Sequence, residues 1–371
     1  MLAAPPATTN LAWLADLAGQ EPPSRRQEDW RFTDLAPLAA VPAGLAAPAP
    51  WDGLELPQGI TRLTDAEASR LAGTALACSH AADAWGVRLN AAARPSLLAL
   101  RVSGAAEPLE LPLLAPAAPG LVAWRLLLLL EPGASLELLQ HVQPAAGQAQ
   151  LLSLVTEVVL AEGAQLQIGS LALGHDQASL LQHLAVRQAP ASTLQASAVA
   201  TGWALARQEP RIVQEQGQAS TQLRALQQVN GRQIADTHSY VRFDGPEGEL
   251  DQLHKALADG AGRSVFNGAV QVPRAAQRTN AAQLSRSLLL SDRARIDTKP
   301  ELEIVADDVK CAHGATISQL QDEQLFYLRS RGIAAAEASQ LLQRAFCEEV
   351  VRSLPALARR HDPMAALLPE A

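Results

Sequence analysis

The sequence predicts a mainly β protein, in which parallel strands stack into a coil between two helical regions. Three observations lead to this fold class: residues 96–310 alternate short aliphatic runs with small or polar residues, turn sequences recur there at a loose period, and helical spacing is confined to the two ends of the 371-residue chain. Hydrophobic residues make up 48% of the chain, so a large core can be buried. We therefore expect an N-terminal helical region over 1–95, a parallel β core over 96–316 and a C-terminal helical region over 317–371.

The N-terminal region is expected to begin with short helices. Asn10 stands where it can cap a helix that Gly19 ends, because the apolar residues between them follow helical spacing. Ser24 and Gln27 have the spacing of a capping box, and Trp30 shortly after them is a candidate anchor. This part of the chain is therefore expected to dock onto a larger structure.

Two further N-terminal stretches lead up to the β core. Four prolines between positions 37 and 50 predict an extended linker, because proline interrupts helices and lacks a backbone N–H. A second helical stretch is expected from Thr64 to about Trp85. The alternation typical of strands then begins at Ser96.

The β core contains a loose repeat. Its turn positions are Gly133, Gly163, Pro190 and Gly217, which stand 30, 27 and 27 residues apart and are each followed by a similar strand-like run. A repeat of this length leaves no room for a helix between strands, so it favours a coiled stack of parallel strands over a sandwich. Each coil would then bury aliphatic side chains against the coils on either side.

Two amphipathic helices are expected after the core. The stretch from Asp322 to Gly332 begins with acidic residues and ends with basic ones, which matches the helix dipole. A second helix from about Ala335 to Leu354 carries one apolar stripe at helical spacing. The pattern alone favours helices that cap the end of the stack, because terminal units of repeat folds usually need a cap.

Composition and motifs argue against several function classes. A net charge of −8 offers no attraction to nucleic acid, and no apolar run approaches the roughly 20 residues of a membrane-spanning helix. The signatures of phosphate loops, zinc proteases, serine hydrolases and dinucleotide-binding folds are absent, which argues against these enzyme classes. An odd count of three cysteines argues against a disulfide framework, and no targeting segment is apparent, so the cytoplasm is the expected location.

Cys311 and His313 form the one pair whose spacing carries chemistry. On a strand, residues i and i+2 point to the same face, which would place thiol and imidazole side by side. Both groups suit iron, zinc or an iron-sulfur cluster, but such sites want about four ligands, so the rest would have to come from another chain. Lys310 would lower the thiol pKa while Asp307 and Asp308 would raise it, and a structural cysteine near a capping histidine fits these residues equally well.

The remaining cysteines and histidines favour ordinary structural roles. Cys78 and Cys347 lie beside helical apolar residues and lack a neighbouring ligand in the sequence. No two histidines have the spacing of a metal-binding pair, so each of the other seven is expected to be a surface or satisfied interior residue. They are His80, His141, His175, His183, His238, His254 and His361.

One long stretch of the chain resembles a known family. The segment LLLSDRARIDTKPELEIVADDVKCAHGATISQLQDEQLFYLRSRGI, residues 288–333, resembles the signature of the SufB/SufD family of iron-sulfur cluster assembly scaffolds. The N-terminal RRQEDWRFTDL is similar to the SufD branch of that family. Members of this branch read Cys-x-His-Gly-Ala, as the chain does from Cys311 to Ala315.

The resemblance implies a right-handed parallel β-helix that acts as a scaffold and not as a catalyst. It implies a heterodimer with SufB, in which each subunit binds one copy of the ATPase SufC. Cys311 and His313 would lie at the SufB interface as possible ligands of a nascent cluster, with Asp307 as a further candidate. The thiol could ligate iron, relay sulfur or only shape the interface, and the chain alone would hold no cofactor stably.

The resemblance also implies that the C-terminal helices dock the ATPase and do not cap the stack. The docking residues would be Leu325, Phe326, Tyr327, Arg329, Arg331, Leu341, Leu342 and Phe346. Two alternatives remain. A β-helix carbohydrate-active enzyme would need aromatic platforms, of which the repeat region has few, and a homodimeric interaction protein would use Cys311 and His313 to bind zinc.

Overall fold

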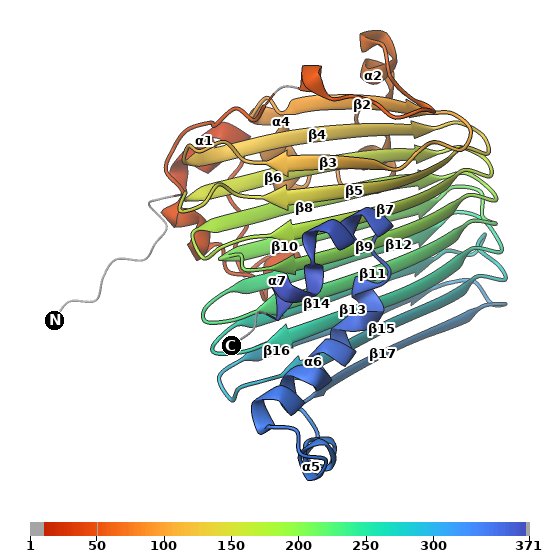
Figure 1. The fold of residues 1–371 in the computed structure, drawn as a ribbon. Helices are drawn as coiled ribbons and strands as arrows, with labels where there is room; N and C mark the ends of the chain where they lie inside the picture. Colours follow the sequence, from red (N-terminus) through yellow and green to blue (C-terminus); the bar gives the residue numbers. More distant parts are fainter. Residues whose placement is uncertain (1–10, 50, 369–371) are drawn as a thin grey trace.

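Two facing parallel sheets form the body of the protein (Figure 1). The computed structural model describes residues 11–49 and 51–368. Sheet A consists of β1 (Ile60–Arg62), β2 (Ser96–Val102), β4 (Gly120–Leu130), β6 (Gln150–Leu160), β8 (Ala178–Gln188), β10 (Leu205–Gln214), β12 (Ile234–Phe243), β14 (Arg263–Val272) and β16 (Arg295–Ile304). Sheet B consists of β3 (Leu109–Leu114), β5 (Ser135–Gln143), β7 (Gln165–Leu173), β9 (Thr193–Thr201), β11 (Ser220–Val229), β13 (Glu249–Ala258), β15 (Asn280–Leu289) and β17 (Lys310–Ser318).

Successive strands from β2 onward alternate between the two sheets, so each coil of the chain contributes one strand to each. Every ladder is parallel except the antiparallel pairing of β1 with β2. This arrangement is a parallel β-solenoid, which confirms the mainly β fold class that the sequence predicted. The division of the chain into three domains stays a prediction.

The sequence repeat corresponds to a stack of turns at one edge of the solenoid. The N–H of Gly133 donates to the carbonyl of Glu162 at 2.9 Å, and the N–H of Gly163 donates to that of Pro190 at 3.1 Å. Gly133 and Gly163 have φ values of 69° and 67°, in the left-handed region that glycine adopts without strain. The left-handed backbone conformation therefore favours glycine at these two turn positions. The N–H of each turn glycine donates a hydrogen bond to the next turn.

The core lies between the two sheets and follows the alternation of the strands. In sheet A, the in-register residues Val186, Ile212, Val241 and Val270 are all buried on the inner face. Stacking like residues in adjacent strands removes their aliphatic surface from water at every coil. Short aliphatic residues therefore recur, because each must fit between similar residues in the strands on either side.

The N-terminal region packs on the outer face of sheet A. It contains α1 (Ala12–Ala18), η2 (Glu28–Trp30), η3 (Ala36–Ala40), η4 (Trp51–Gly53), α2 (Asp65–Leu71), α3 (Thr74–Cys78) and α4 (Trp85–Ala92). Gly19 ends α1 in a left-handed conformation, as predicted, while the proposed cap Asn10 lies outside the described residues. Leu14, Trp85 and Leu89 are buried in one cluster with strand residues such as Leu151, so this region covers that face.

Three N-terminal expectations are wrong in detail. The N–H of Ser24 donates to Gln27 Oε1 at 3.2 Å, but a turn and the short 3₁₀ helix η2 follow in place of an α-helix. The described part of the predicted linker, residues 37–49, includes most of η3 and packs onto the core, where Leu38 is fully buried.

The single helix expected over 64–85 is divided. Gly73 adopts a φ of 83° and separates α2 from α3, and Trp85 begins α4. Thr64 caps α2 with a complete capping box, because its side chain accepts from the N–H of Glu67 while that carboxylate accepts from the N–H of Thr64. Because left-handed glycine stops a helix, the stretch holds two short helices, α2 and α3, and reaches only the first residue of α4.

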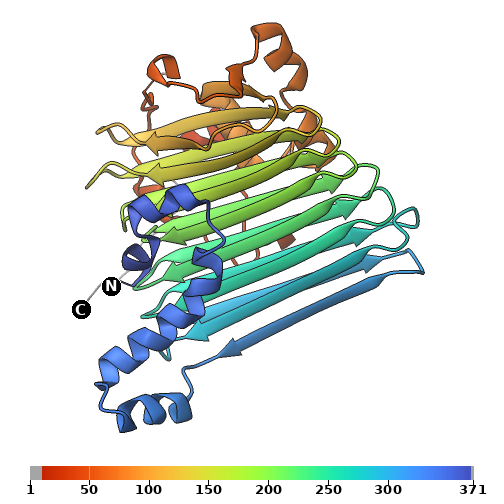
Figure 2. The same cartoon turned by 45° about the vertical axis from the view of Figure 1, so that its right-hand side comes forward.

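The C-terminal elements are α5 (Asp322–Ser330), α6 (Ala335–Val351), η5 (Ala356–His361) and α7 (Pro363–Leu367). Helix α6 crosses the outer face of sheet B, where Cys347, Val350 and Leu354 are buried against Val199 and its neighbours (Figure 2). Helix α5 projects beyond β17 (Figure 1). Capping of the stack by these helices is therefore wrong, because the apolar face of α6 covers aliphatic side chains on the outside of sheet B. None of the described helices has the length and apolar character needed to cross a membrane.

The two ends of the solenoid differ. At the N-terminal end, antiparallel β1 finishes sheet A, and edge strand β3 contains Pro112, which offers no backbone N–H. At the C-terminal end, β16 pairs only with β14 and β17 only with β15 among the described residues. We call this second end, formed by β16, β17 and the turn between them, the open end.

Candidate functional site

Cys311 and His313 lie on the inner side of the last strand at the open end. Strand β17 pairs in register with β15, which places Cys311 beside Ala281 and His313 beside Gln283. Both β15 residues are buried, so Cys311 and His313 continue the inner face of sheet B. Cys311 is half-buried against the end of the core and His313 is exposed. The thiol and the imidazole therefore share one face of a strand that no further coil covers.

The inner face becomes polar as it approaches the open end. One register column begins with Ile168, Ala196 and Leu223 and continues with Gln252, Gln283 and His313. Gln283 Nε2 donates to Gln252 Oε1 at 3.0 Å. Gln283 Oε1 is buried and has no hydrogen-bond partner among the described residues. The buried acceptor Gln283 Oε1 thus lies in the strand next to His313. An aliphatic side chain at this position would avoid the free-energy cost of an unsatisfied buried oxygen.

Burial favours the neutral thiol form of Cys311 over the thiolate. Burial raises the pKa of Cys311, and a backbone hydrogen bond from Ala281 opposes this only in part. The charged neighbours Asp307, Asp308 and Lys310 are exposed to solvent, which screens their charges. From the sequence alone, the pKa of Cys311 could be either raised or lowered. In the structure, burial raises it.

A groove on the outer side of sheet B reaches the same strand. It has a volume of about 450 Å³, and its lining includes Arg286, Gly314 and Glu349 and, at the edge of the sheet, the inner-face residue His313. Charged side chains from β15 and α6 therefore stand close to the open end. The edge of β17 is accessible both from the end of the stack and from this groove.

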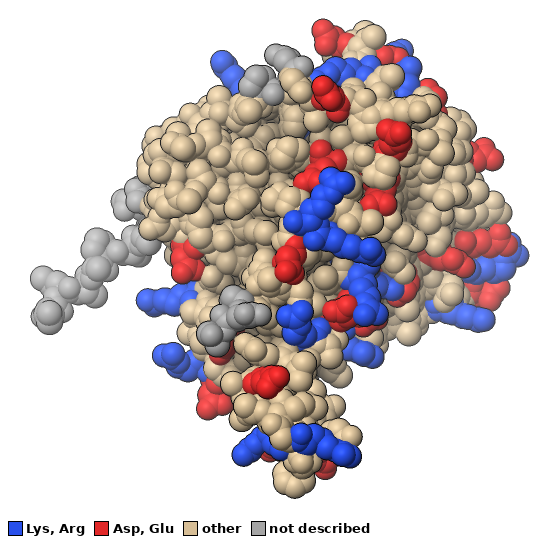
Figure 3. Space-filling model, viewed as in Figure 1, with Lys and Arg blue, Asp and Glu red and all other residues tan. Residues whose placement is uncertain are grey.

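The predicted docking residues surround a projection formed by α5 and the start of α6. Phe326 is 74% exposed and Tyr327 is 58% exposed, and the guanidinium of Arg331 lies 5.4 Å from the Tyr327 ring centre. A cavity of about 310 Å³ between the helices is lined by Tyr327, Leu328 and Leu342, among others. In the space-filling view, this projection carries both basic and acidic side chains (Figure 3).

The other predicted docking residues divide between this projection and the body of the protein. Arg329 and Leu341 are exposed and Leu325 is half-buried. Phe346 differs, because Lys255 Nζ lies 4.9 Å from its ring centre and donates to its carbonyl oxygen at 2.8 Å. Phe346 therefore packs on strand β13 of its own chain.

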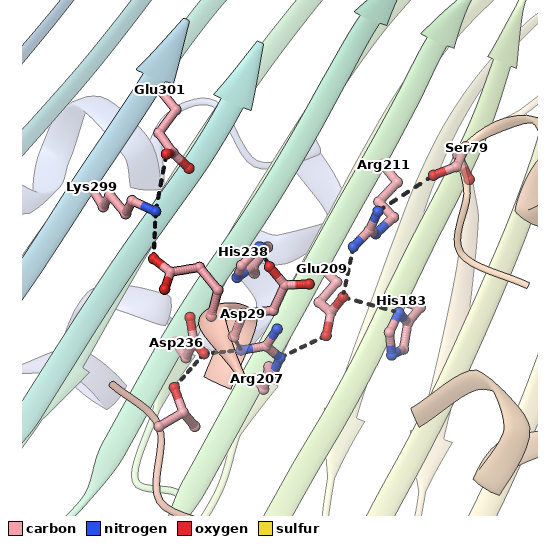
Figure 4. A network of polar contacts seen from close by, with 12 residues as sticks. Asp29, Ser79, His183, Arg207, Glu209, Arg211, Asp236, His238, Lys299 and Glu301 are labelled. Atoms are coloured by element: carbon pink, nitrogen blue, oxygen red, sulfur yellow. Dashed lines mark hydrogen bonds and ion pairs between the residues drawn. The ribbon is translucent and has the colours of Figure 1, made fainter. Parts of the chain in front are cut away.

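A buried network of charges on the outer face of sheet A has a structural role (Figure 4). The Arg207 guanidinium lies 3.8 Å from the Trp30 ring centre, donates to Glu209 Oε1 at 2.6 Å and pairs with Asp236. Burial alone would raise the pKa of Glu209, but Arg207 and other basic neighbours hold it below its usual range. These charges compensate one another and hold Trp30 against the strands. The sequence predicted Trp30 as an anchor but gave no indication that Arg207 packs against its ring.

Comparison with known proteins identifies the family. Residues 115–346 match the family model described as "SUF system FeS cluster assembly, SufBD core domain". The chain belongs to this family. The matched residues include strands β4 to β17, all of α5 and most of α6. Cys311, His313 and the predicted docking residues therefore all lie within the SufBD core.

Individual SufBD relatives agree with this assignment. The chain is 38% identical over 245 residues to an iron-sulfur cluster assembly SufBD family protein of Synechocystis, covering 64% of this chain and 54% of that protein. It is 40% identical over 202 residues to the chloroplastic protein ABCI7 of Arabidopsis thaliana, covering 54% and 42%. It is 43% identical over 122 residues to iron-sulfur cluster assembly protein SufD of Escherichia coli, covering 33% and 29%. The chain thus spans about half or less of the length of these curated relatives.

Membership in the SufBD family agrees with the resemblance that the Cys-x-His-Gly-Ala motif carried, and relatives named SufD support the SufD branch. It also favours a scaffold-type component of iron-sulfur assembly over the carbohydrate-active alternative. The family match covers the solenoid from β4 onward and the α5–α6 projection. The roles of the individual residues are taken up as proposals below.

Proposed function

We propose that this chain is a non-catalytic scaffold subunit of a SUF complex, in which it pairs with SufB through the open end and docks the ATPase SufC through α5 and α6. The observation that carries the proposal is the position of Cys311 and His313 on the inner side of an uncapped end strand. The cluster is the cargo of this assembly, and the chain alone holds it only weakly.

The open end has the properties of a subunit interface. Ile304 is 41% exposed, Val305 is 58% exposed and Ile317 is 45% exposed, so apolar side chains face solvent along both end strands. The free backbone edges of β16 and β17 can accept strands from a second solenoid. A partner that continued the stack would cover these apolar residues and bring its own side chains next to Cys311.

The chemistry of the pair fits a shared cluster site. A thiolate and an imidazole provide two ligands, and an iron-sulfur cluster wants about four, so SufB would supply the others. Burial raises the pKa of the Cys311 thiol, and iron binding would oppose this shift, because a metal lowers the pKa of a bound thiol. Cluster formation would thus depend on the complex.

The α5–α6 projection supports ATPase docking on physical grounds. Large apolar side chains on an exposed helix are typical of helix-in-groove recognition, and Phe326 and Tyr327 are adjacent on α5. Arg329 and Arg331 at the end of this helix can pair with acidic residues of a partner. The nucleotide cycle of the ATPase would then act on the scaffold through α6, which lies across sheet B.

Co-expression with SufB and SufC tests the proposal. We expect the three proteins to co-purify through this chain, and Cys311→Ala to leave the complex intact while it slows cluster assembly measured by visible absorption. Cys78→Ala is the matched control, since Cys78 is also half-buried but lies in α3 away from the open end. Assembly at the unmodified rate in the Cys311→Ala complex would overturn the site assignment.

The isolated chain provides a second test. The open end could pair with a second copy, and in the zinc-binding alternative such a homodimer would retain stoichiometric zinc on Cys311 and His313. We expect a C311S/H313Q variant to keep the oligomeric state of the unmodified chain, as determined by light scattering. Cytoplasmic location and the lack of nucleic-acid or membrane partners stay predictions of the sequence.

A further inference from the structure

A second cluster of ligand-type side chains lies far from the open end, near the first coils of sheet B. It brings together Glu110 of β3, His141 of β5 and His361 at the end of η5. One potential ligand atom from each of the three residues lies within 4.8 Å of the other two. His361 Nε2 donates to Glu110 Oε1 at 2.6 Å, and the rings of His141 and His361 have centres 3.9 Å apart.

His141 is the residue that this arrangement leaves unexplained. It is only 9% exposed, and its Nε2 atom is buried without a hydrogen-bond partner among the described residues. Buried ring nitrogens in native proteins nearly always have a partner, because an unsatisfied polar atom costs free energy. An unpartnered, buried imidazole next to a second imidazole and a carboxylate is typical of a metal ligand.

We propose that Glu110, His141 and His361 bind one divalent transition-metal ion, with Zn²⁺ as the best match. Two imidazoles and one carboxylate are a common ligand set for zinc, and the set leaves a fourth position for water or another ligand. With bonds of about 2.0–2.2 Å, tetrahedral ligand atoms lie roughly 3.3 Å apart. The 2.6 Å contact between His361 and Glu110 would therefore open by less than about 1 Å as the ion replaced the shared proton.

The surroundings allow this adjustment. Glu110 and His361 have side chains that are 21% and 23% exposed, so both can shift toward an ion that enters from solvent. Arg360 Nη1 lies 3.9 Å from the other carboxylate oxygen of Glu110, and its positive charge would oppose the metal. Its side chain is 71% exposed and can move into water without losing a buried contact.

The ion would join parts of the chain that are distant in sequence. Glu110 and His141 belong to two paired strands, whereas His361 belongs to the segment after α6 that packs on the outside of sheet B. Metal binding would therefore fasten this C-terminal segment to the first coils of the solenoid. The site is independent of Cys311 and His313, and it departs from the expectation that the chain alone binds no metal stably.

Metal titration of the full-length, untagged chain tests this inference. The protein is stripped with a chelator and titrated with Zn²⁺ and with Co²⁺, whose visible absorption reports a four-coordinate site. We expect one ion per chain, and an affinity at least about tenfold lower in each of H361Q, E110Q and H141Q. The matched control is H175Q, which removes a half-buried histidine from the turn before β8 and should bind as the unmodified chain does.

A structural readout accompanies the titration, because H141Q alters a buried position. Zn²⁺ should raise the thermal midpoint of the unmodified chain and of H175Q, and should leave that of H361Q and E110Q unchanged. Failure of the unmodified chain to bind either ion would overturn the inference. Binding that survives in H361Q and E110Q but disappears in C311S/H313Q would also overturn it, since the metal would then lie at the open end. Neither result depends on the proposed function.

Discussion

Replacing Phe326 by alanine tests the proposed ATPase-docking surface directly, because this side chain contributes little to the fold. Phe326 is 74% exposed on α5, a helix without a single buried residue. The substitution should therefore leave the thermal midpoint of the chain within error of the unmodified value. Any effect on partner binding would come from the lost contact and not from misfolding.

The size of the effect follows from the exposed area. A buried aromatic side chain removes about 150–250 Å² from water, so Phe326 has roughly 150 Å² available for burial by a partner. At about 25 cal/mol per Å², complete burial would contribute about 4 kcal/mol. Alanine keeps part of the contact and docking must order the ring, so we expect a loss of about 2 kcal/mol, or roughly 30-fold in affinity.

The assay is the dissociation constant of the purified ATPase partner, measured by calorimetry against the isolated chain. Leu114→Ala is the matched control, because Leu114 is 50% exposed on β3 at the opposite end of the stack. It removes exposed apolar surface without touching α5. An unchanged affinity for Phe326→Ala, or an equal loss for both variants, would refute the assignment of α5 as the docking element.

Three other predictions concern the chemistry and stability of the chain. Because burial raises the pKa of Cys311, alkylation of its thiol at pH 7 should be slower than that of free cysteine and should accelerate at alkaline pH. Mass spectrometry can follow the reaction. A rate equal to that of free cysteine would contradict the raised pKa. Arg207→Met removes the nearest cation from two buried carboxylates, Glu209 and Asp236, and should cost about 3–5 kcal/mol in denaturant unfolding. Arg187→Met removes an ion pair that is about one-third exposed and should cost about 0–1 kcal/mol. Equal costs would contradict the structural role of Arg207. Burial lowers the pKa of His254 to about 3, whereas its pKa in the unfolded chain is about 6.5. Below pH 6.5 the unfolded chain therefore binds a proton that the folded chain does not. The free energy of unfolding should decrease by up to about 5 kcal/mol as the pH falls from 6.5 toward 3. His254→Leu should reduce this acid sensitivity, and an unchanged pH dependence would show that other groups cause it.

The solenoid could be predicted from the sequence because its signals are local. Gly133 and Gly163 occupy left-handed turn positions in successive coils, so the repeat appears directly as a spacing of residues. The strand alternation that placed Cys311 and His313 on one face is likewise a property of neighbouring residues. Both features can be read without knowing what lies across the core.

Packing between distant segments was not accessible in the same way. Prolines made residues 37–50 resemble a free linker, but Leu38 finds a buried position on sheet A. The apolar pattern of α6 alone favours a cap, whereas its stripe covers the outside of sheet B around Val199. In both cases the apolar residues were evident and the surface that receives them was not, because that surface is formed by strands far along the chain.

The cluster of Glu110, His141 and His361 shows the same limit at a candidate site. The two histidines are separated by most of the solenoid in sequence, and no spacing rule connects them. Only the return of the C-terminal segment across sheet B brings His361 next to β3 and β5. Composition could therefore count eight histidines without revealing which two are neighbours.

The inequality between the two ends of the solenoid limits how the chain can assemble. Among the described residues, one end is blunted by the antiparallel strand β1 and by Pro112 in β3, whereas the other end presents two parallel edge strands. A subunit that pairs through one end alone forms a dimer and cannot extend further. The difference between the two ends therefore disfavours end-on growth into fibres.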